Sequence, residues 1–169
     1  MRAFWIAALG AALLTGCTDS AMDAPGAGTD PNAVTDTAAG AGGIGDIDST
    51  EYFESVIGDR VYFATDEFTL DSAAQTTLDE QADWLSRNPG VGARIEGHAD
   101  ERGTREYNLA LGARRANAAR NYLIGQGVRA DRLESVSFGK ERPVATCSEP
   151  SCWAQNRRAV SVLEAAPGS

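Results

Sequence analysis

Large apolar side chains are distributed unevenly along this chain, and this restricts where a folded core can form. From Cys17 to about Glu54 the sequence consists mainly of Ala, Gly, Thr, Asp and Pro, with scarcely an aliphatic side chain larger than Val or Ile. Such a segment cannot bury enough apolar area to offset its conformational entropy. We therefore expect a flexible tether over residues 17–54, one folded domain over residues 55–165 and a disordered tail over residues 166–169.

Residues 1–16 have the pattern of an export signal. Arg2 supplies a positive charge, and the apolar run Ala3–Leu14 that follows is shorter than the about 20 residues needed to span a bilayer. Leu14-Thr15-Gly16-Cys17 resembles a bacterial lipobox, which implies cleavage before Cys17 and lipidation of its thiol. Two or more acyl chains at Cys17 would anchor the protein durably. The alternative is an ordinary secretory signal whose cysteine falls there by chance.

The residue after the cysteine indicates the membrane. In lipoproteins an aspartate at that place would favour retention at the inner membrane, but this chain has Thr18 there. We therefore expect a lipid anchor in the outer membrane, with the domain facing the periplasm. A tether of about 40 flexible residues has a root-mean-square span of roughly 35 Å, so the domain could reach well away from the lipid.

Charge is as uneven as hydrophobicity. No Lys or Arg occurs from Ala3 to Asp59, and much of the net charge of -9 lies in that interval. Its acidic residues are Asp19, Asp23, Asp30, Asp36, Asp46, Asp48, Glu51, Glu54 and Asp59. Because binding to phosphate backbones requires a basic surface, nucleic acid is an unfavoured partner.

Two cysteines remain besides Cys17. Cys147 and Cys152 are separated by four residues in "CSEPSCW", and an exported protein meets an oxidising compartment, so we expect a local disulfide. A zinc pair is the alternative. It is disfavoured because His98 is the only histidine and no second cysteine pair is present, whereas structural zinc takes four ligands.

Hydrophobic periodicity predicts alternating strands and helices after Ile57. A helix capped by Asp71 or Ser72 should stop at Pro89-Gly90, and a longer helix capped by Thr104 should run over about 105–126. Strands are expected at 60–65, 91–99, 132–139 and 159–164, with a short helix at 153–157. The order β-α-β-α-β-(short α)-β predicts a two-layer α+β domain with a mixed sheet and helices packed on one face.

The segment "EGHADERGTREYN", Glu96–Asn108, concentrates polar chemistry at the junction of a strand, a loop and a helix. Asp100 and Glu101 could be taken for catalytic carboxylates, but neighbouring loop residues usually diverge and no activated nucleophile is evident. A metal site is disfavoured because His98 has too few partner ligands. A simpler role for His98 is a hydrogen bond to the backbone or an acidic neighbour. We therefore expect neither an enzyme nor a bound metal or cofactor.

Helical spacing favours binding instead. Asn108, Leu111 and Arg115 fall on one stripe of the longer helix, with Asn108 near the Asp100 loop. Asp100 could accept a hydrogen bond from an ammonium group, and Arg115 could bind a carboxylate with two N–H groups. Such a pair would suit a zwitterion. The alternative, that Arg115 pairs with Glu101 or Glu106 on the surface, remains open from spacing alone.

Four stretches carry a resemblance to a known family. They are "VYFATDEFTLDSAA", "EGHADERGTREYNLALGARRANAARNYL", "VSFGKERP" and "NRRAV". Together they resemble the outer-membrane-protein-A-like domain superfamily and, within it, the family of peptidoglycan-associated lipoproteins. The match covers about residues 61–162 in the family's order.

This resemblance implies non-covalent binding of the peptidoglycan stem peptide at its diaminopimelate residue. Asp100 would take the ammonium group and Arg115 the carboxylate. The resemblance also assigns Asn108, Phe63 and Asp66 to the site, with Arg157 and Arg158 near the same groove. Leu111 joins the expected site through its helical stripe, and His98 as a supporting residue of the segment Glu96–Asn108.

The resemblance further implies partners. The family associates with the Tol system, above all with TolB, and links the outer membrane to the cell wall as the envelope constricts at division. Two features depart from the family's general pattern, the loop between Cys147 and Cys152 and the long acidic tether. They put partner contacts near residues 146–153 in doubt.

Overall fold

A computed structural model describes residues 46–166 of this protein. The predicted export signal, the predicted lipidation at Cys17, most of the predicted tether and residues 167–169 lie outside the described residues. The described helices and strands are α1 (Thr50–Tyr52), η1 (Phe53–Gly58), β1 (Arg60–Tyr62), α2 (Ser72–Arg87), β2 (Val91–His98), α3 (Arg105–Gly125), η2 (Ala130–Arg132), β3 (Leu133–Gly139), α4 (Pro150–Asn156) and β4 (Arg158–Ala165).

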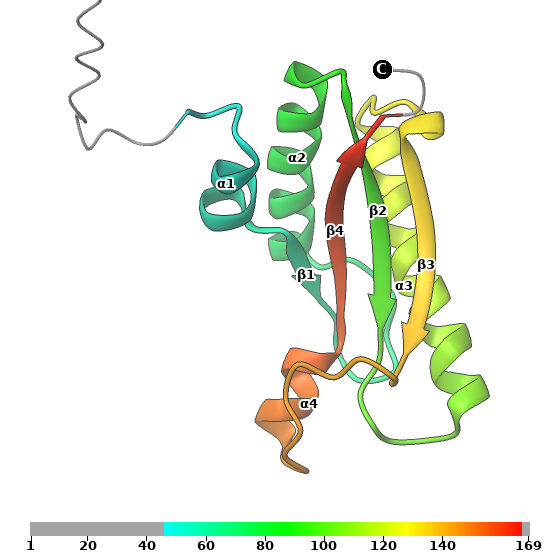
Figure 1. Ribbon diagram of the computed structural model, residues 1–169. Helices are drawn as coiled ribbons and strands as arrows, with labels where there is room; N and C mark the ends of the chain where they lie inside the picture. Colours follow the sequence, from blue (N-terminus) through cyan, green and yellow to red (C-terminus); the bar gives the residue numbers. More distant parts are fainter. Residues whose placement is uncertain (1–45, 167–169) are drawn as a thin grey trace, which may run out of the picture. The chain divides into compact units, whose positions relative to one another are not determined.

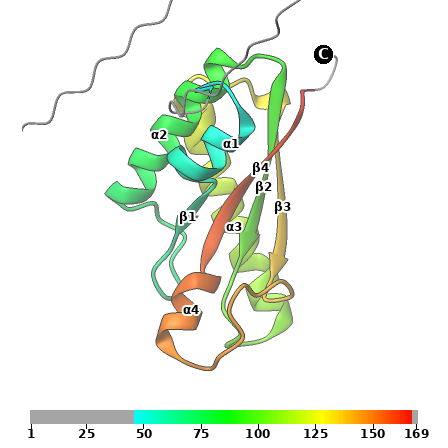
Figure 2. The same ribbon diagram turned by 60° about the vertical axis from the view of Figure 1, so that its left-hand side comes forward.

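The strands form one four-stranded sheet in the order β1-β4-β2-β3 (Figure 1). β2 and β3 are parallel and are connected through α3, whereas β4 pairs antiparallel with both β1 and β2. Helices α2 and α3 cover the same face of this sheet, as the turned view shows (Figure 2). The predicted two-layer α+β architecture with a mixed sheet is confirmed.

Both long helices begin where their capping residues predict. The Asp71 carboxylate accepts a hydrogen bond from the Ala74 amide at 2.8 Å, and the Thr104 hydroxyl accepts one from the Tyr107 amide at 3.2 Å. Each cap satisfies an amide that a helix start otherwise leaves without a partner. Thr104 matters most for function, because it fixes the point where the Asp100 loop becomes α3.

A pair of glycines lets α3 lie close to the sheet. A Cβ atom at Gly97 in β2 would overlap the carbonyl oxygen of Gly112 in α3, and one at Gly112 would approach the Gly97 oxygen to 2.8 Å. Side chains at these positions would therefore push the helix away from the strand. This approach sets how far the N-terminal turns of α3 stand from the end of β2, where the polar segment lies.

The domain begins earlier than residue 55, which corrects the predicted boundary of the tether. Phe53 is fully buried and contacts the Trp84 ring at a centroid distance of 5.0 Å. The Trp84 indole N–H donates to the Ile47 carbonyl at 2.9 Å, and Arg87 pairs with Asp48 at 2.9 Å. Residues 46–53, called the N-terminal arm below, therefore pack on α2. The buried Phe53 and the partly buried Tyr52 offset the polarity of the rest of this segment.

The C-terminal boundary moves by one residue. Ala166 is buried and its amide donates to the Gly90 carbonyl at 2.9 Å, so this residue belongs to the domain and not to a disordered tail. Within the described range, no helix is long and apolar enough to cross a membrane.

The predicted disulfide between Cys147 and Cys152 is confirmed. It closes a short loop that leads into α4, which begins at Pro150, three residues earlier than predicted. The buried Asn156 side chain ties this loop to the end of α4. Its oxygen accepts from the amides of Val144 and Ala145, and its nitrogen donates to the Ala145 carbonyl at 2.7 Å.

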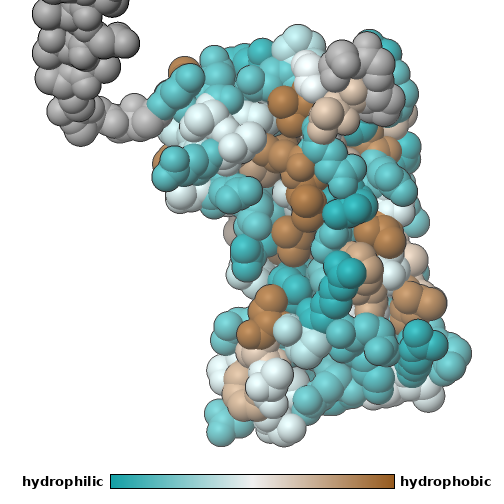
Figure 3. Space-filling view, viewed as in Figure 1, coloured by the Kyte–Doolittle hydropathy of each residue, from teal (hydrophilic) through white to brown (hydrophobic). Residues whose placement is uncertain are grey.

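The face of the sheet that lies opposite α2 and α3 carries apolar and charged side chains side by side (Figure 3). Glu96 pairs with Val160 on β4 and Val136 on β3, and Arg94 pairs with Val162. Cross-strand partners point to the same side of a sheet, so these residues share this face. Arg94 forms an ion pair with Glu96 at 3.2 Å there.

Candidate ligand-binding site

The loop between β2 and α3 presents Asp100 at the end of the sheet. Asn108, in the first turn of α3, donates to the Arg102 carbonyl at 2.7 Å, and Lys140 donates to the carbonyls of Glu101 and Gly103 at 3.2 and 2.7 Å. Gly103 has a φ of 87°, a conformation that favours glycine. Asn108 is 2% exposed, so it acts by holding this loop in shape.

The Asp100 carboxylate lies between two guanidinium groups. Arg102 contacts it at 2.6 Å through Nη2 and at 3.2 Å through Nε, and Arg157 contacts it at 3.4 Å through Nη1. Burial tends to raise the pKa of Asp100, but the hydrogen bonds from Arg102 and Arg157 outweigh it and hold the pKa below its usual value. Asp100 is therefore an anion at neutral pH.

Asp100 lines a pocket of about 230 Å³ together with residues from the rim loop, which we define as residues 63–71 between β1 and α2. The other lining residues are Thr65, Asp66, Arg102, Gly103 and Tyr107. Asp66 has a φ of 58° and accepts a hydrogen bond from the Tyr107 hydroxyl at 3.4 Å. Two carboxylates facing one opening give it an affinity for cationic groups.

Glu101, the other acidic residue of the motif, is directed elsewhere. It is exposed, and its carboxylate accepts a hydrogen bond from the Trp153 indole at 3.1 Å. The neighbouring carboxylates of Asp100 and Glu101 therefore meet different partners, as expected for adjacent loop residues. They do not form a pair that flanks a common substrate bond.

Arg115 lies deeper than its helical spacing indicates. The residue is 0% exposed and donates to three backbone carbonyls, those of Glu67 at 2.8 Å, His98 at 2.9 Å and Ala64 at 3.1 Å. Burial and the neighbouring Arg157 lower the pKa of Arg115 to about 10, so it stays charged at neutral pH. Arg115 does not line the pocket, and it joins the rim loop to the end of β2.

Phe63 and Leu111 belong to the interior next to the pocket. The Arg115 guanidinium lies 5.1 Å from the centre of the Phe63 ring, and Phe63 is 5% exposed. Leu111 is 3% exposed. Neither side chain lines the opening, and Phe63 supports the Arg115 guanidinium. Their predicted contact with a ligand stays a prediction.

His98 points to the other side of the sheet. Its ring stacks on Phe138 at 5.7 Å and lies 3.7 Å from the Glu96 carboxylate, on the face that carries Arg94. Burial, together with the guanidinium groups of Arg158 and Arg142, lowers the pKa of His98 to about 4. Only its backbone carbonyl reaches the site, through Arg115.

Four residues that line the pocket were not predicted, namely Thr65, Arg102, Gly103 and Tyr107. Their positions depend on how the loops fold, and the sequence motif gave only the weak signal that Arg102 and Tyr107 lie inside it. Trp153, also not predicted, lies beside these residues, since its ring stacks on the Arg102 guanidinium at 4.3 Å. Arg157, which was predicted, is brought to Asp100 by the end of α4.

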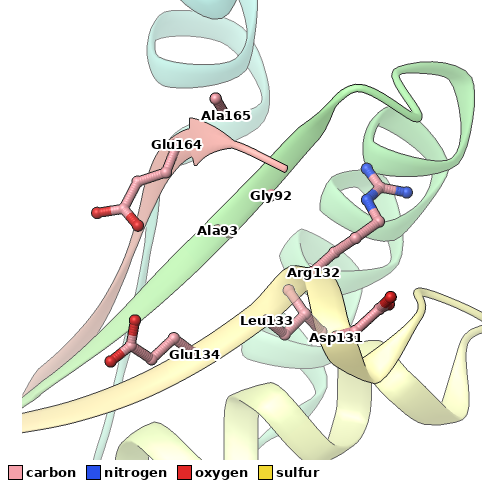
Figure 4. A pocket seen from close by; sticks show the side chains of 8 residues that line it. All are labelled: Gly92, Ala93, Asp131, Arg132, Leu133, Glu134, Glu164 and Ala165. Atoms are coloured by element: carbon pink, nitrogen blue, oxygen red, sulfur yellow. The ribbon is translucent and has the colours of Figure 1, made fainter. Parts of the chain in front are cut away.

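A second pocket, of about 120 Å³, lies at the opposite end of the sheet, where β2 begins (Figure 4). The Glu134 and Glu164 side chains face its opening, whereas the Arg132 side chain runs away from it and donates to the carbonyls of Leu85 and Asn88. Asp131 on its rim pairs with Arg129. The pocket holds none of the residues of the polar motif.

Known proteins resemble this chain in sequence. Residues 62–158 match the OmpA family. A peptidoglycan-associated lipoprotein from Agrobacterium fabrum is 53% identical over 133 residues, which cover 79% of this chain and 75% of that protein. One from Mesorhizobium japonicum is 52% identical over 136 residues, which cover 80% of this chain and 81% of that protein.

Solved structures share the fold. The crystal structure of the peptidoglycan-associated lipoprotein from Burkholderia pseudomallei aligns with a TM-score of 0.63 at 42% identity, covering 66% of this chain and 96% of that one. The C-terminal domain of Helicobacter pylori MotB aligns with a TM-score of 0.60 at 19% identity, covering 64% and 86%, and this likeness concerns the fold alone. By sequence and by fold, the chain belongs to the OmpA family and, within it, to the peptidoglycan-associated lipoproteins.

Proposed function

We propose that this protein is a non-enzymatic, lipid-anchored outer-membrane protein that binds peptidoglycan non-covalently. The observation that carries the proposal is the ionised Asp100 carboxylate, which lines a pocket shared with Asp66 and lies between Arg102 and Arg157. Alternating anions and cations in one opening complement a zwitterion. The names of the relatives, which are peptidoglycan-associated lipoproteins, support the same ligand.

Within peptidoglycan, the proposed contact is the diaminopimelate residue of the stem peptide. It carries an ammonium group and a carboxylate on one tetrahedral carbon, and Asp100 would take the ammonium group. Arg115 would take the carboxylate through N–H groups that it does not donate to backbone carbonyls, since a guanidinium has five. Because the rim loop covers Arg115, this second contact requires residues 64–67 to move.

The proposed cellular role follows from two attachments on one chain. Lipid on Cys17 would hold the protein in the outer membrane, and the domain would hold peptidoglycan. As part of the Tol-Pal system, with TolB and other Tol proteins as partners, the protein would link the two layers while the envelope constricts at cell division. Capture of purified TolB by the immobilised chain checks this partner, and no capture at micromolar concentration would count against it.

Sedimentation with purified peptidoglycan sacculi tests the binding proposal. Asp100→Asn keeps the shape of the side chain and removes its charge, so we expect at least a tenfold loss of affinity, equivalent to about 1.4 kcal/mol or more. Asp131→Asn is the matched control, because Asp131 lies at the other end of the sheet. It should bind like the unchanged protein.

Two results would contradict the proposal. Equal sedimentation of the Asp100→Asn and Asp131→Asn variants would show that Asp100 takes no part in binding. Release of soluble muropeptides from the sacculi by the purified protein would identify an enzyme that cuts the wall and would exclude a purely binding role.

A further inference from the structure

The Asp100 carboxylate is already occupied in this structure by a side chain of the same loop. Arg102 contacts both carboxylate oxygens, Oδ2 at 2.6 Å and Oδ1 at 3.2 Å, and its backbone amide donates to Oδ1 at 3.2 Å. A carboxylate offers about four acceptor positions. With Arg157 contributing a further contact at 3.4 Å, these groups fill the acceptor positions of Asp100.

Arg102 is the partner that can leave. Its side chain is 42% exposed, whereas the Asp100 side chain is 9% exposed and that of Arg157 is 13% exposed. Rotation of Arg102 into solvent therefore uncovers the carboxylate without disturbing the core. An incoming ammonium group needs the same acceptor positions, so it and the Arg102 guanidinium exclude each other.

A second contact holds Arg102 over Asp100. The guanidinium lies 4.3 Å from the centre of the Trp153 ring, and the Trp153 indole N–H is itself fixed by Glu101 at 3.1 Å. Trp153 follows Cys152 directly, in the helix that the disulfide joins to Cys147. Trp153, about 50 residues from the polar motif, thus helps to hold Arg102 over the Asp100 carboxylate, which we call the closed position of Arg102.

We propose that Arg102 is a built-in competitor for the ligand's ammonium group, and that Trp153 on the disulfide-closed helix stabilises it in that place. The pair would set the affinity of the pocket and would favour ligands whose ammonium group displaces the guanidinium. This inference rests on the proposed binding of diaminopimelate at Asp100. It assigns an affinity-setting role to two residues outside the predicted site.

The size of the effect follows from the population of the closed position. If Arg102 covers Asp100 nine-tenths of the time, its removal raises the affinity for an ammonium ligand about tenfold. Loss of the Trp153 ring removes only the stacking interaction that favours the closed position of Arg102. At a partly exposed site this corresponds to about a two- to fivefold gain in affinity for the ligand. Both substitutions should therefore tighten binding, and Arg102→Gln should do so more strongly.

The test is a calorimetric titration of the full chain in detergent with the tripeptide N-acetyl-L-alanyl-γ-D-glutamyl-meso-diaminopimelate, whose only ammonium group is on diaminopimelate. We expect Arg102→Gln to bind it five to ten times more tightly than the unchanged protein, and Trp153→Leu two to five times more tightly. Arg105→Gln is the matched control for charge, because Arg105 pairs with Glu141 and its side chain is 72% exposed. It should leave the affinity unchanged.

A second ligand separates competition from a general effect. When the side-chain amine of diaminopimelate is acetylated, no ammonium group competes with Arg102, so Arg102→Gln should give no gain. Unchanged or weaker binding of the unmodified tripeptide by Arg102→Gln would overturn the inference while leaving the proposed function intact. Absence of binding by the unchanged protein, or full binding by Asp100→Asn, would overturn the proposed function and this inference with it.

Discussion

His98 is a buried histidine whose ring nitrogens have no hydrogen-bond partner among residues 46–166. The charged groups around it are Glu96, Arg142 and Arg158, and its pKa of about 4 lies below the usual value of about 6.5. The folded protein therefore keeps the ring neutral while the unfolded chain takes up a proton as the pH falls through 6.5. The contribution of His98 to the free energy of unfolding is therefore complete above that pH. It declines as the pH falls, until His98 in the folded state is also protonated, near pH 4.

The low pKa of His98 predicts a pH dependence of the free energy of unfolding that the substitution His98→Gln removes. Between pH 7 and pH 5, protonation of His98 in the unfolded chain should lower the free energy of unfolding by about 2 kcal/mol. The variant His98→Gln should lack this part of the decline, whatever its stability at pH 7. Urea unfolding of both proteins at the two pH values measures the difference, and parallel declines would refute the assignment.

At the scale of elements, the N-terminal arm is attached mainly through the fully buried Phe53, with the partly buried Tyr52 packed against the same core. Phe53 is fully buried against Trp84, and the polar contacts near it are a hydrogen bond from Trp84 and the exposed pair of Arg87 with Asp48. Exposed ion pairs contribute about 0 to 1 kcal/mol, whereas burying a phenylalanine contributes several times more. The aromatic contact therefore decides whether the arm docks.

We expect Phe53→Ala to lower the free energy of unfolding by about 3 kcal/mol, because it leaves a cavity beside Trp84. Val56→Ala in the same short helix is the control, since Val56 is 59% exposed and its loss should change stability by less than about 0.5 kcal/mol. Denaturant midpoints of the two variants give the comparison. A similar small loss in both would show that the arm is not part of the cooperative unit.

Elements with strong local signals could be predicted from sequence, and those that depend on tertiary contacts could not. Asp71 and Thr104 mark helix starts because capping is local, and the long helices and strands follow from periodicity. Phe53 lies in a polar segment without periodicity, so its burial against Trp84 gave no signal. The insertion of β4 between β1 and β2 is a long-range pairing and was likewise left open.

The same distinction applies to the candidate site. Helical spacing placed Arg115 on the stripe of Asn108. Spacing predicts which face of a helix a side chain lies on, but not how deeply that side chain is buried. The rim loop that buries Arg115 comes from a distant segment of the chain. Arg102 lies within the recognised motif, yet its contact with Asp100 depends on the loop conformation. Trp153 lies about 50 residues further along the chain, in α4, and its contact with Arg102 is a tertiary contact.

On the scale of the whole domain, the arm and the pocket lie at opposite ends of the sheet. Ile47 and Asp48 contact Trp84 and Arg87 near the end of α2, just before β2 starts. Asp100 lies two residues after His98, the last residue of β2. A strand of this length spans about 26 Å, so the direction from arm to pocket runs along β2.

If the protein links membrane and wall as proposed, that arrangement determines how the domain responds to mechanical force between the two layers. Hydrogen bonds from β2 to β3 and β4 lie across the direction of pull and bear it together, whereas the few contacts of the arm break one after another. Pulling from Asp46 against Asp100 in a single-molecule experiment should therefore release about 25 Å of chain from the arm before the sheet unfolds. A single unfolding step would contradict this. The connection between the two layers would lengthen under load before it fails.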